Sequence, residues 1–198
     1  TVSDVIEMVN EYDKDGSKIG MIQKGDIAEY CADAINNGLD CRYLAYRNDT
    51  IDKHMKEIRQ QLHGRNVQGF VVGEPVTSLT GIQGVINNNH EGTITHIGDV
   101  IKLHGITCCP VTLDDELTVI AAIDIKEKQN REIGFFRLFE KFKAQAGLSS
   151  DFKAKADSLE KSLEASAQGY KIRDEIAELR PCVASTVHKA QGSTFDVA

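Results

Sequence analysis

A run of polar residues near the end of the chain carries the side chains best suited to chemistry. It reads STVHKAQGST over residues 185–194 and follows the short run PCVA. A strand that ends in hydroxyl residues, followed by a glycine and a helix start, offers free N–H groups that bind phosphate or another anion. Open α/β sheets bind ligands at the carboxyl ends of their strands. The donors within the run are Thr186, His188, Lys189, Gln191, Ser193 and Thr194. The alternative on residue types alone is a polar loop that caps a helix.

The cysteines and the remaining histidines show no metal or disulfide spacing. The cysteine count of five is odd and no pair has CxxC spacing, which argues against a zinc ribbon or a disulfide framework and favours a reduced, intracellular setting. Adjacent Cys108 and Cys109 point to opposite faces if they lie in a strand, so we interpret them as packing residues. The other five histidines lack HxH or HxxxH spacing, and structural roles are expected. No metal ligands are predicted.

Composition and charge exclude several classes of protein. Apolar residues make up 41% and charged residues 27%, which excludes general disorder. No stretch approaches 18 apolar residues, so no membrane-spanning helix is expected. The net charge of −7 argues against a broad basic surface, although residues 125–180 hold 12 Lys/Arg against 10 Asp/Glu. The first residues do not resemble a secretory signal, and they lack an initial Met, so we expect a fragment.

Helix and strand patterns alternate at the start of the chain. We expect a short helix over 3–10, a helix over 26–37 that Asp26 caps and Gly38 ends, a strand over 41–46 and a helix over 50–64 that Thr50 caps. The apolar face of the 26–37 helix would be Ile27, Tyr30, Cys31, Ala34 and Ile35. Alternation at this spacing indicates α/β architecture with a parallel sheet.

The pattern changes twice along the middle of the chain. Residues 67–124 contain short β-forming runs between turn residues, which predict an antiparallel sheet or barrel of about five strands. Residues 125–180 return to helix. We expect an antiparallel hairpin whose second helix stops at Gly169, followed by a third helix from Tyr170 that ends before Pro181. Four aromatic residues lie close together on the first helix, and we interpret them as core: Phe135, Phe136, Phe139 and Phe142.

The α/β pattern resumes with a strand at CVAST, residues 182–186. The fold class is therefore predicted as α/β, with a parallel-sheet domain formed by residues 1–66 and 181–198. An inserted β-barrel at 67–124 and a helical extension at 125–180 would interrupt it. We expect CRYLAY and CVAST to be strands of one parallel sheet.

Three segments resemble superfamily 1 DNA helicases, most closely the RecD-like and phage Dda-type branch that moves 5′ to 3′. STVHKAQGSTFD is similar to the family's motif V. CRYLAYRNDTIDKHMKEIRQQLHG, with Arg47-Asn48 at its turn, resembles the region around motif IV. FVVGEPV, residues 70–76, is similar to the start of an inserted SH3-like barrel. The resemblance implies a second RecA-like motor domain, related to P-loop NTPases, with that barrel inserted.

The resemblance also implies roles for individual residues. Gln191 would act in catalysis at the nucleotide, and Gly192, Arg47 and Lys189 would lie in the nucleotide cleft. Four residues would contact the DNA backbone without reading sequence: Thr186, His188, Ser193 and Thr194. The partners implied are single-stranded DNA and an N-terminal RecA-like domain, with no membrane, in the cytoplasm of a bacterium or phage-infected cell.

The chain lacks a GxxxxGK[ST] phosphate loop. The acidic runs Asp114–Glu116 and Asp174–Glu175 are not expected to follow apolar strands, so neither predicts a magnesium-binding Walker B box. If the resemblance holds, ATP and Mg²⁺ would therefore be bound only by the full-length helicase. Such a helicase would act in DNA replication, recombination or repair. The fragment alone is expected to bind neither and to hydrolyse no ATP. Two alternatives stay open: a non-catalytic nucleic-acid- or protein-binding module, and a RecD-like exonuclease subunit.

Overall fold

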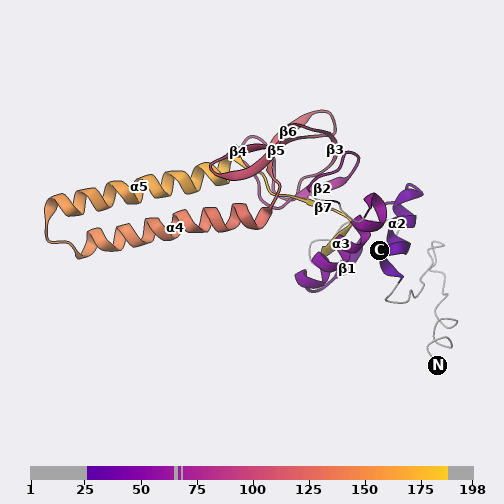
Figure 1. The fold of residues 1–198 in the computed structure, drawn as a ribbon, viewed down its shortest axis with the longest axis horizontal. Coiled ribbons are helices and arrows are strands. Elements are labelled where there is room, and N and C mark those ends of the chain that lie inside the picture. The colour runs from indigo at the N-terminus through magenta and orange to yellow at the C-terminus, as the bar shows by residue number, and fades with distance from the viewer. Residues whose placement is uncertain (1–25, 65–66, 68, 187–198) are drawn as a thin grey trace, which may run out of the picture. The chain divides into compact units, whose positions relative to one another are not determined.

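The computed structural model describes residues 26–64, 67 and 69–186. The chain forms two compact units, with boundaries after Val67 and after Cys182 (Figure 1). The first unit contains the residues before the first boundary and after the second, so it is discontinuous in sequence. The fold is mixed α/β, and the described residues form four helices, a parallel two-stranded sheet and an antiparallel sheet. The expected helix over 3–10 lies outside the described residues.

The first unit is built on a parallel pair of strands. β1 (Tyr43–Ala45) pairs with β8 (Ala184–Thr186), and Tyr43 lies opposite Ala184. This confirms the prediction that the two segments share one parallel sheet. Each strand has three residues, so the strands are shorter than the apolar runs that predicted them.

Helix α2 (Ile27–Asn36) confirms the helix expected over 26–37. The helix ends at Asn36, Asn37 is its C-cap, and Gly38 follows with a φ of +80°, the left-handed conformation that glycine adopts without strain. The Gly38 N–H donates to the Ile35 carbonyl at 2.9 Å, and the Leu39 N–H donates to the Ala34 carbonyl at 3.1 Å. Asp26 occupies the N-cap position, but its side chain makes no capping hydrogen bond there.

Helix α3 (Asn48–His63) begins two residues earlier than predicted. Thr50 therefore lies in the first turn, and the prediction that it caps the helix is wrong. Arg47 takes the N-cap position with extended backbone, and its carbonyl accepts the first helical bond from Ile51 at 3.1 Å. The Asp49 carboxylate accepts the Thr50 N–H at 2.9 Å, which satisfies a donor that has no partner within the helix.

The two helices bury small and β-branched side chains against the strands. The buried cluster of this unit consists of Cys31, Ala34, Cys41, Ile58 and Val183. Of the apolar face predicted for α2, Tyr30 is the exception, because 46% of its surface is exposed. Ile51 of α3 is fully buried.

The second unit contains an antiparallel sheet. Its strands are β2 (Pro75–Ser78), β3 (Glu91–Ile97), β4 (Ile101–Leu103), β5 (Ile106–Leu113), β6 (Leu117–Ala122) and β7 (Leu179–Pro181). The order is β4-β5-β3-β2-β7, and β6 also pairs with β5. Five of these strands arise from the segment predicted to be β-rich, which confirms that prediction. Leu179 and Arg180 of β7 come from the segment that was predicted to be helical, and Pro181 comes from the predicted parallel-sheet domain.

The turn between β5 and β6 overturns one expectation about the acidic runs. Asp114 directly follows β5, so this run does follow an apolar strand. Asp114 and Asp115 have φ of +52° and +60° because they form the tight turn into the antiparallel strand β6. The Asp114 carboxylate accepts the Thr93 N–H at 2.9 Å. This hydrogen bond links the turn between β5 and β6 to β3.

Helices α4 (Ile125–Leu148) and α5 (Phe152–Glu175) form the predicted hairpin. α5 continues through Gly169, so the predicted stop and the third helix are both wrong. A Cβ atom at Gly169 would lie 3.0–3.2 Å from the ring of Phe136. The lack of a side chain at Gly169 thus allows α4 and α5 to approach each other closely here. After Glu175 the chain is extended, and the Ala177 N–H donates to the Ile120 carbonyl at 2.7 Å.

The four phenylalanines of α4 are half-buried. Phe135 packs against a buried cluster of Ile106, Cys108, Ala122, Ile172 and Ile176, which joins the hairpin to the sheet. Phe136 meets Tyr170 edge-on, with ring centroids 5.4 Å apart. The facing residues of α5 that are buried are small at Ser162, Ala165 and Gly169. Over the part of the chain that the structure describes, no helix is long and apolar enough to cross a membrane.

Candidate functional site

The carboxyl edge of the β1–β8 pair holds the two predicted site residues that the structure describes. The register sets Thr186 opposite Ala45, so both strands end at the same edge of the sheet. Arg47 follows Ala45 by two residues, between β1 and α3. Thr186 and Arg47 are far apart in sequence, with the whole second unit between them along the chain. Parallel pairing nevertheless brings the two strand ends together, at the kind of edge where α/β sheets bind ligands.

Arg47 holds a carboxylate in a forked ion pair. Its Nη2 lies 2.6 Å and its Nε 3.1 Å from the two oxygens of Asp49. This hydrogen bonding from Arg47 holds the pKa of Asp49 below its usual value. The side chains are 73% and 64% exposed, so the pair contributes little to stability. The guanidinium fork of Arg47 also has the geometry that binds a phosphate group.

The remaining predicted site residues follow β8 along the chain. Thr186 is half-buried at the last position of the strand. His188, Lys189, Gln191, Gly192, Ser193 and Thr194 lie outside the described residues. The end of β8 thus fixes where this segment starts, at the same edge as Arg47.

A buried histidine packs α3 against β1. His54 of α3 is 4% exposed, and its ring packs on Tyr43 of β1 with centroids 4.5 Å apart. The contact fixes α3 against the strand that precedes Arg47. His54 therefore has the structural role expected of it.

The described cysteines are free and buried. In the first unit, a hydrogen bond between the two thiols lowers the pKa of Cys31 and raises that of Cys41. Cys108 and Cys109 belong to different buried clusters, as expected for adjacent residues of a strand. Burial raises the pKa of Cys108 to about 11. A thiol with so high a pKa is a poor nucleophile, which fits a packing role.

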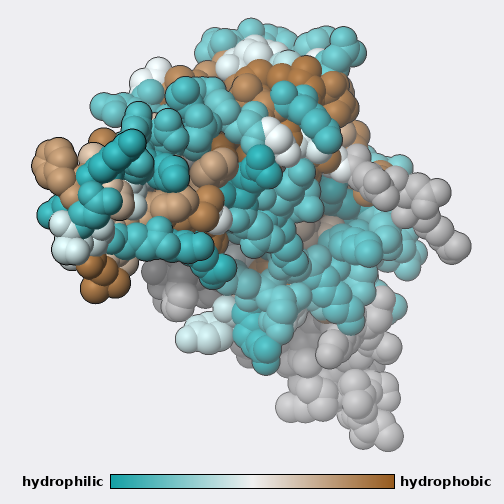
Figure 2. Space-filling model, turned by 60° about the vertical axis from the view of Figure 1, so that its left-hand side comes forward, coloured by the Kyte–Doolittle hydropathy of each residue, from teal (hydrophilic) through white to brown (hydrophobic). Residues whose placement is uncertain are grey.

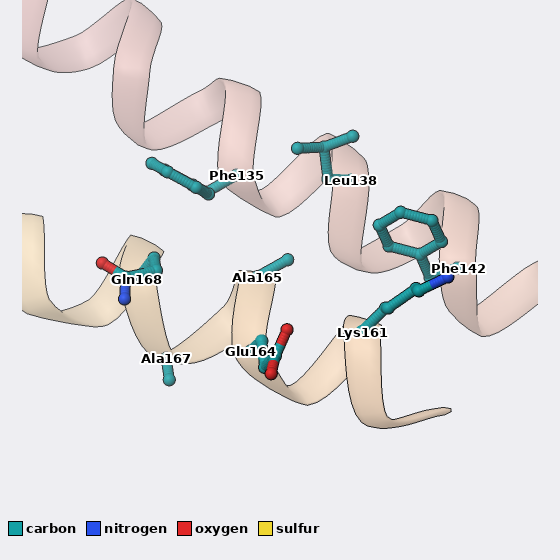
Figure 3. A pocket seen from close by; sticks show the side chains of 8 residues that line it. All are labelled: Phe135, Leu138, Phe142, Lys161, Glu164, Ala165, Ala167 and Gln168. Atoms are coloured by element: carbon teal, nitrogen blue, oxygen red, sulfur yellow. The ribbon is translucent and has the colours of Figure 1, made fainter. Parts of the chain in front are cut away.

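A groove lies between α4 and α5. Its α4 side is lined by Phe135, Leu138 and Phe142 (Figure 3). It has a volume of about 440 Å³, and its α5 side is formed by Lys161, Glu164, Ala165, Ala167 and Gln168. Lys161 and Glu164 place opposite charges on one wall, so the groove has no dominant charge.

A buried ion network at the base of the hairpin was not predicted from the sequence. The Lys128 ammonium is fully buried and lies 2.8 Å from Oε1 of Glu178, which is 2% exposed. Gln129 donates to the other Glu178 oxygen at 2.9 Å. Glu132 lies 3.6 Å from Lys128 and also pairs with Arg173 of α5. A signal was present: Lys128, Glu132, Phe135, Phe139 and Phe142 repeat at four and three residues, so two charges fall on the stripe that faces the other helix.

Among the described residues, no group of three or more His, Cys, Asp or Glu side chains is arranged to hold a metal ion. The described residues at the strand edge instead offer an arginine fork and a hydroxyl, and the sequence that follows Thr186 is rich in donors. These are groups that bind phosphate. A scan against models of known protein families finds no match to this chain, and a search of curated proteins finds none either.

Proposed function

We propose that the chain is a second RecA-like motor domain of a superfamily 1 DNA helicase, of the RecD-like or phage Dda-type branch, with an inserted SH3-like barrel. The observation that carries the proposal is the parallel pairing of β1 with β8. It sets Arg47 and the start of the STVHKAQGST segment at one sheet edge. Both segments resemble helicase motifs, and both are expected there if one edge serves nucleotide and DNA.

The role proposed for each residue follows from the chemistry of its side chain. Arg47 binds a nucleotide phosphate with its guanidinium fork, as it now holds Asp49. Gln191 orients the attacking water, and Gly192 and Lys189 complete the cleft. Thr186, His188, Ser193 and Thr194 donate to DNA phosphates. ATP and Mg²⁺ supply the energy-releasing phosphoryl transfer in the full-length protein, where Mg²⁺ neutralises charge on the phosphates.

The test separates the two roles in the full-length protein. Gln191→Ala is expected to lower DNA-stimulated ATP turnover by about 10²-fold, the scale for losing one group that acts in the transition state. Its affinity for single-stranded DNA is expected to stay within about twofold of the parent, since the side chain faces the nucleotide. Steady-state ATPase and fluorescence anisotropy with a labelled oligonucleotide measure the two quantities.

The double variant Thr186→Ala, His188→Ala is expected to do the reverse. Each lost phosphate contact costs about 1–3 kcal/mol of DNA binding, to a similar extent for every sequence. Lys171→Ala, an exposed position on α5, is the control and should change neither quantity. If the substitutions at 186, 188 and 191 only unfold the protein, the segment is a helix cap and the proposal fails.

The 198-residue chain by itself is expected to show no ATPase above background, with or without single-stranded DNA. The physical reason is the lack of a phosphate loop in its sequence. A colorimetric phosphate assay on the purified chain measures this. Magnesium-dependent turnover that survives further purification would contradict the expectation.

A further inference from the structure

The tip of the α4–α5 hairpin, residues 141–155, exposes two large apolar side chains. Leu148 at the end of α4 is 88% exposed, and Phe152 at the start of α5 is 86% exposed. No other large apolar side chain in the described part of the chain exceeds 77%. The loop between them is short and polar, and Ser149 donates to the Asp151 carbonyl at 3.2 Å. Figure 2, in which this side of the molecule comes forward, shows apolar patches among hydrophilic surface.

The same tip is the most basic short stretch of the hairpin. It carries four exposed lysines, Lys141, Lys143, Lys153 and Lys155, against one acidic residue, Asp151. Its net charge is therefore +3, in a chain whose net charge is −7. The Asp151 carboxylate already accepts the Lys153 N–H at 3.1 Å as the cap of α5. The charge and the apolar pair together indicate a partner that is anionic and also has apolar faces.

The size of the apolar pair decides between the anionic partners. A membrane surface needs a broad apolar face in addition to basic residues. The tip offers one leucine and one phenylalanine, which do not make a broad apolar face. A nucleic-acid strand needs less, because a single aromatic ring stacks one base and nearby cations hold the adjoining phosphates.

We propose that the hairpin tip is a second contact point for single-stranded DNA. One base stacks on Phe152, and the lysines of the tip contact the phosphates on either side. Each helix of 24 residues spans about 36 Å, so the tip lies at the far end of a long arm. The choice of DNA rests on the proposed helicase function, whereas the exposed apolar pair and the charge do not.

Because the chain has no tryptophan, a stacking reporter can be placed at the tip. Phe152→Trp keeps an aromatic ring, and its fluorescence is expected to be quenched when a dT20 oligonucleotide is added. Leu163→Trp is the matched control, since Leu163 is 67% exposed on the same helix but outside the tip. The fluorescence of this control should not respond. Fluorescence of the Phe152→Trp variant that is not quenched by dT20, or equal quenching in both variants, would overturn the proposal.

Affinity and its salt dependence provide a second readout. Phe152→Ala is expected to weaken dT20 binding by at least about fivefold, the lower end for a base stacked on an aromatic ring. The plot of log affinity against log salt has a negative slope. The double variant Lys143→Gln, Lys153→Gln should make this slope less steep by about 1.4. Lys171→Gln, at an exposed position of α5 outside the tip, should leave the slope unchanged. Circular dichroism checks that each variant keeps its helices.

The outcomes separate this proposal from the motor function. If Thr186→Ala with His188→Ala lowers DNA affinity while the tip variants do not, the tip proposal fails and the motor proposal stands. If only the tip variants lower it, the tip proposal stands. A third arm uses vesicles of phosphatidylserine and phosphatidylcholine. A blue shift in the fluorescence of the Phe152→Trp variant with vesicles, and no response to dT20, would overturn DNA as the partner.

Discussion

Lys128→Met is expected to destabilise the second unit by about 3–5 kcal/mol, the cost of removing one partner of a buried ion pair. The substitution leaves the Glu178 carboxylate buried with only the Gln129 amide as a hydrogen-bond partner of its side chain. A buried charge that loses its counterion has neither water nor a cation to stabilise it. Urea denaturation followed by circular dichroism measures the change in the free energy of unfolding.

Two further variants identify the cause. Lys128→Met combined with Glu178→Gln removes both charges and keeps an acceptor for Gln129, so it should recover at least about half of the lost stability. Lys53→Met breaks an ion pair with Glu57 whose side chains are 65% and 39% exposed, and should cost less than about 1 kcal/mol. A Lys128→Met protein as stable as Lys53→Met would show that the buried pair does not anchor the hairpin.

Ile172→Ala is expected to cost about 2–5 kcal/mol, because it leaves a cavity where the hairpin meets the sheet. The Ile172 side chain is completely buried, and it belongs to the cluster that contains Ile106, Cys108 and Ala122. Ile172→Val removes one methylene and should cost about 0.5–1.5 kcal/mol. The same urea denaturation ranks the three proteins.

Leu163→Ala, on the outer face of the same helix, is the matched control. Leu163 is 67% exposed, so its truncation should stay within about 0.5 kcal/mol of the parent protein. Hydrogen exchange adds a local readout, since loss of the Ile172 contact should speed amide exchange in α5. Equal effects at positions 163 and 172 would contradict the assignment of Ile172 to the junction of hairpin and sheet.

The expected site could be located from the sequence only in part. The polar run at 185–194 was recognised from residue types and spacing, whereas Arg47 was assigned to the site only through the resemblance to helicases. The structure places the strand ends that precede Arg47 and that contain Thr186 at one edge. The ion pair of Arg47 with Asp49 was not foreseen, because the types of neighbouring turn residues do not indicate which side chains meet.

Local pattern alone predicted most helices and strands of this protein, although it did not predict the full length of α5. Apolar residues at three- and four-residue spacing specified α2 and α3, and short β-forming runs between turn residues specified β2 to β6, because these periods reflect which face of each element is buried.

Tertiary structure decided the rest. Residues 179–181 became β7 because pairing with β2 satisfies their backbone groups. Gly169 lies within α5, where the Phe136 ring of α4 packs so close that a Cβ atom would lie 3.0–3.2 Å from it. Lys128 is buried because Glu178, distant in sequence, supplies its counterion. Each of these outcomes depends on a partner from another part of the chain, which no local window contains.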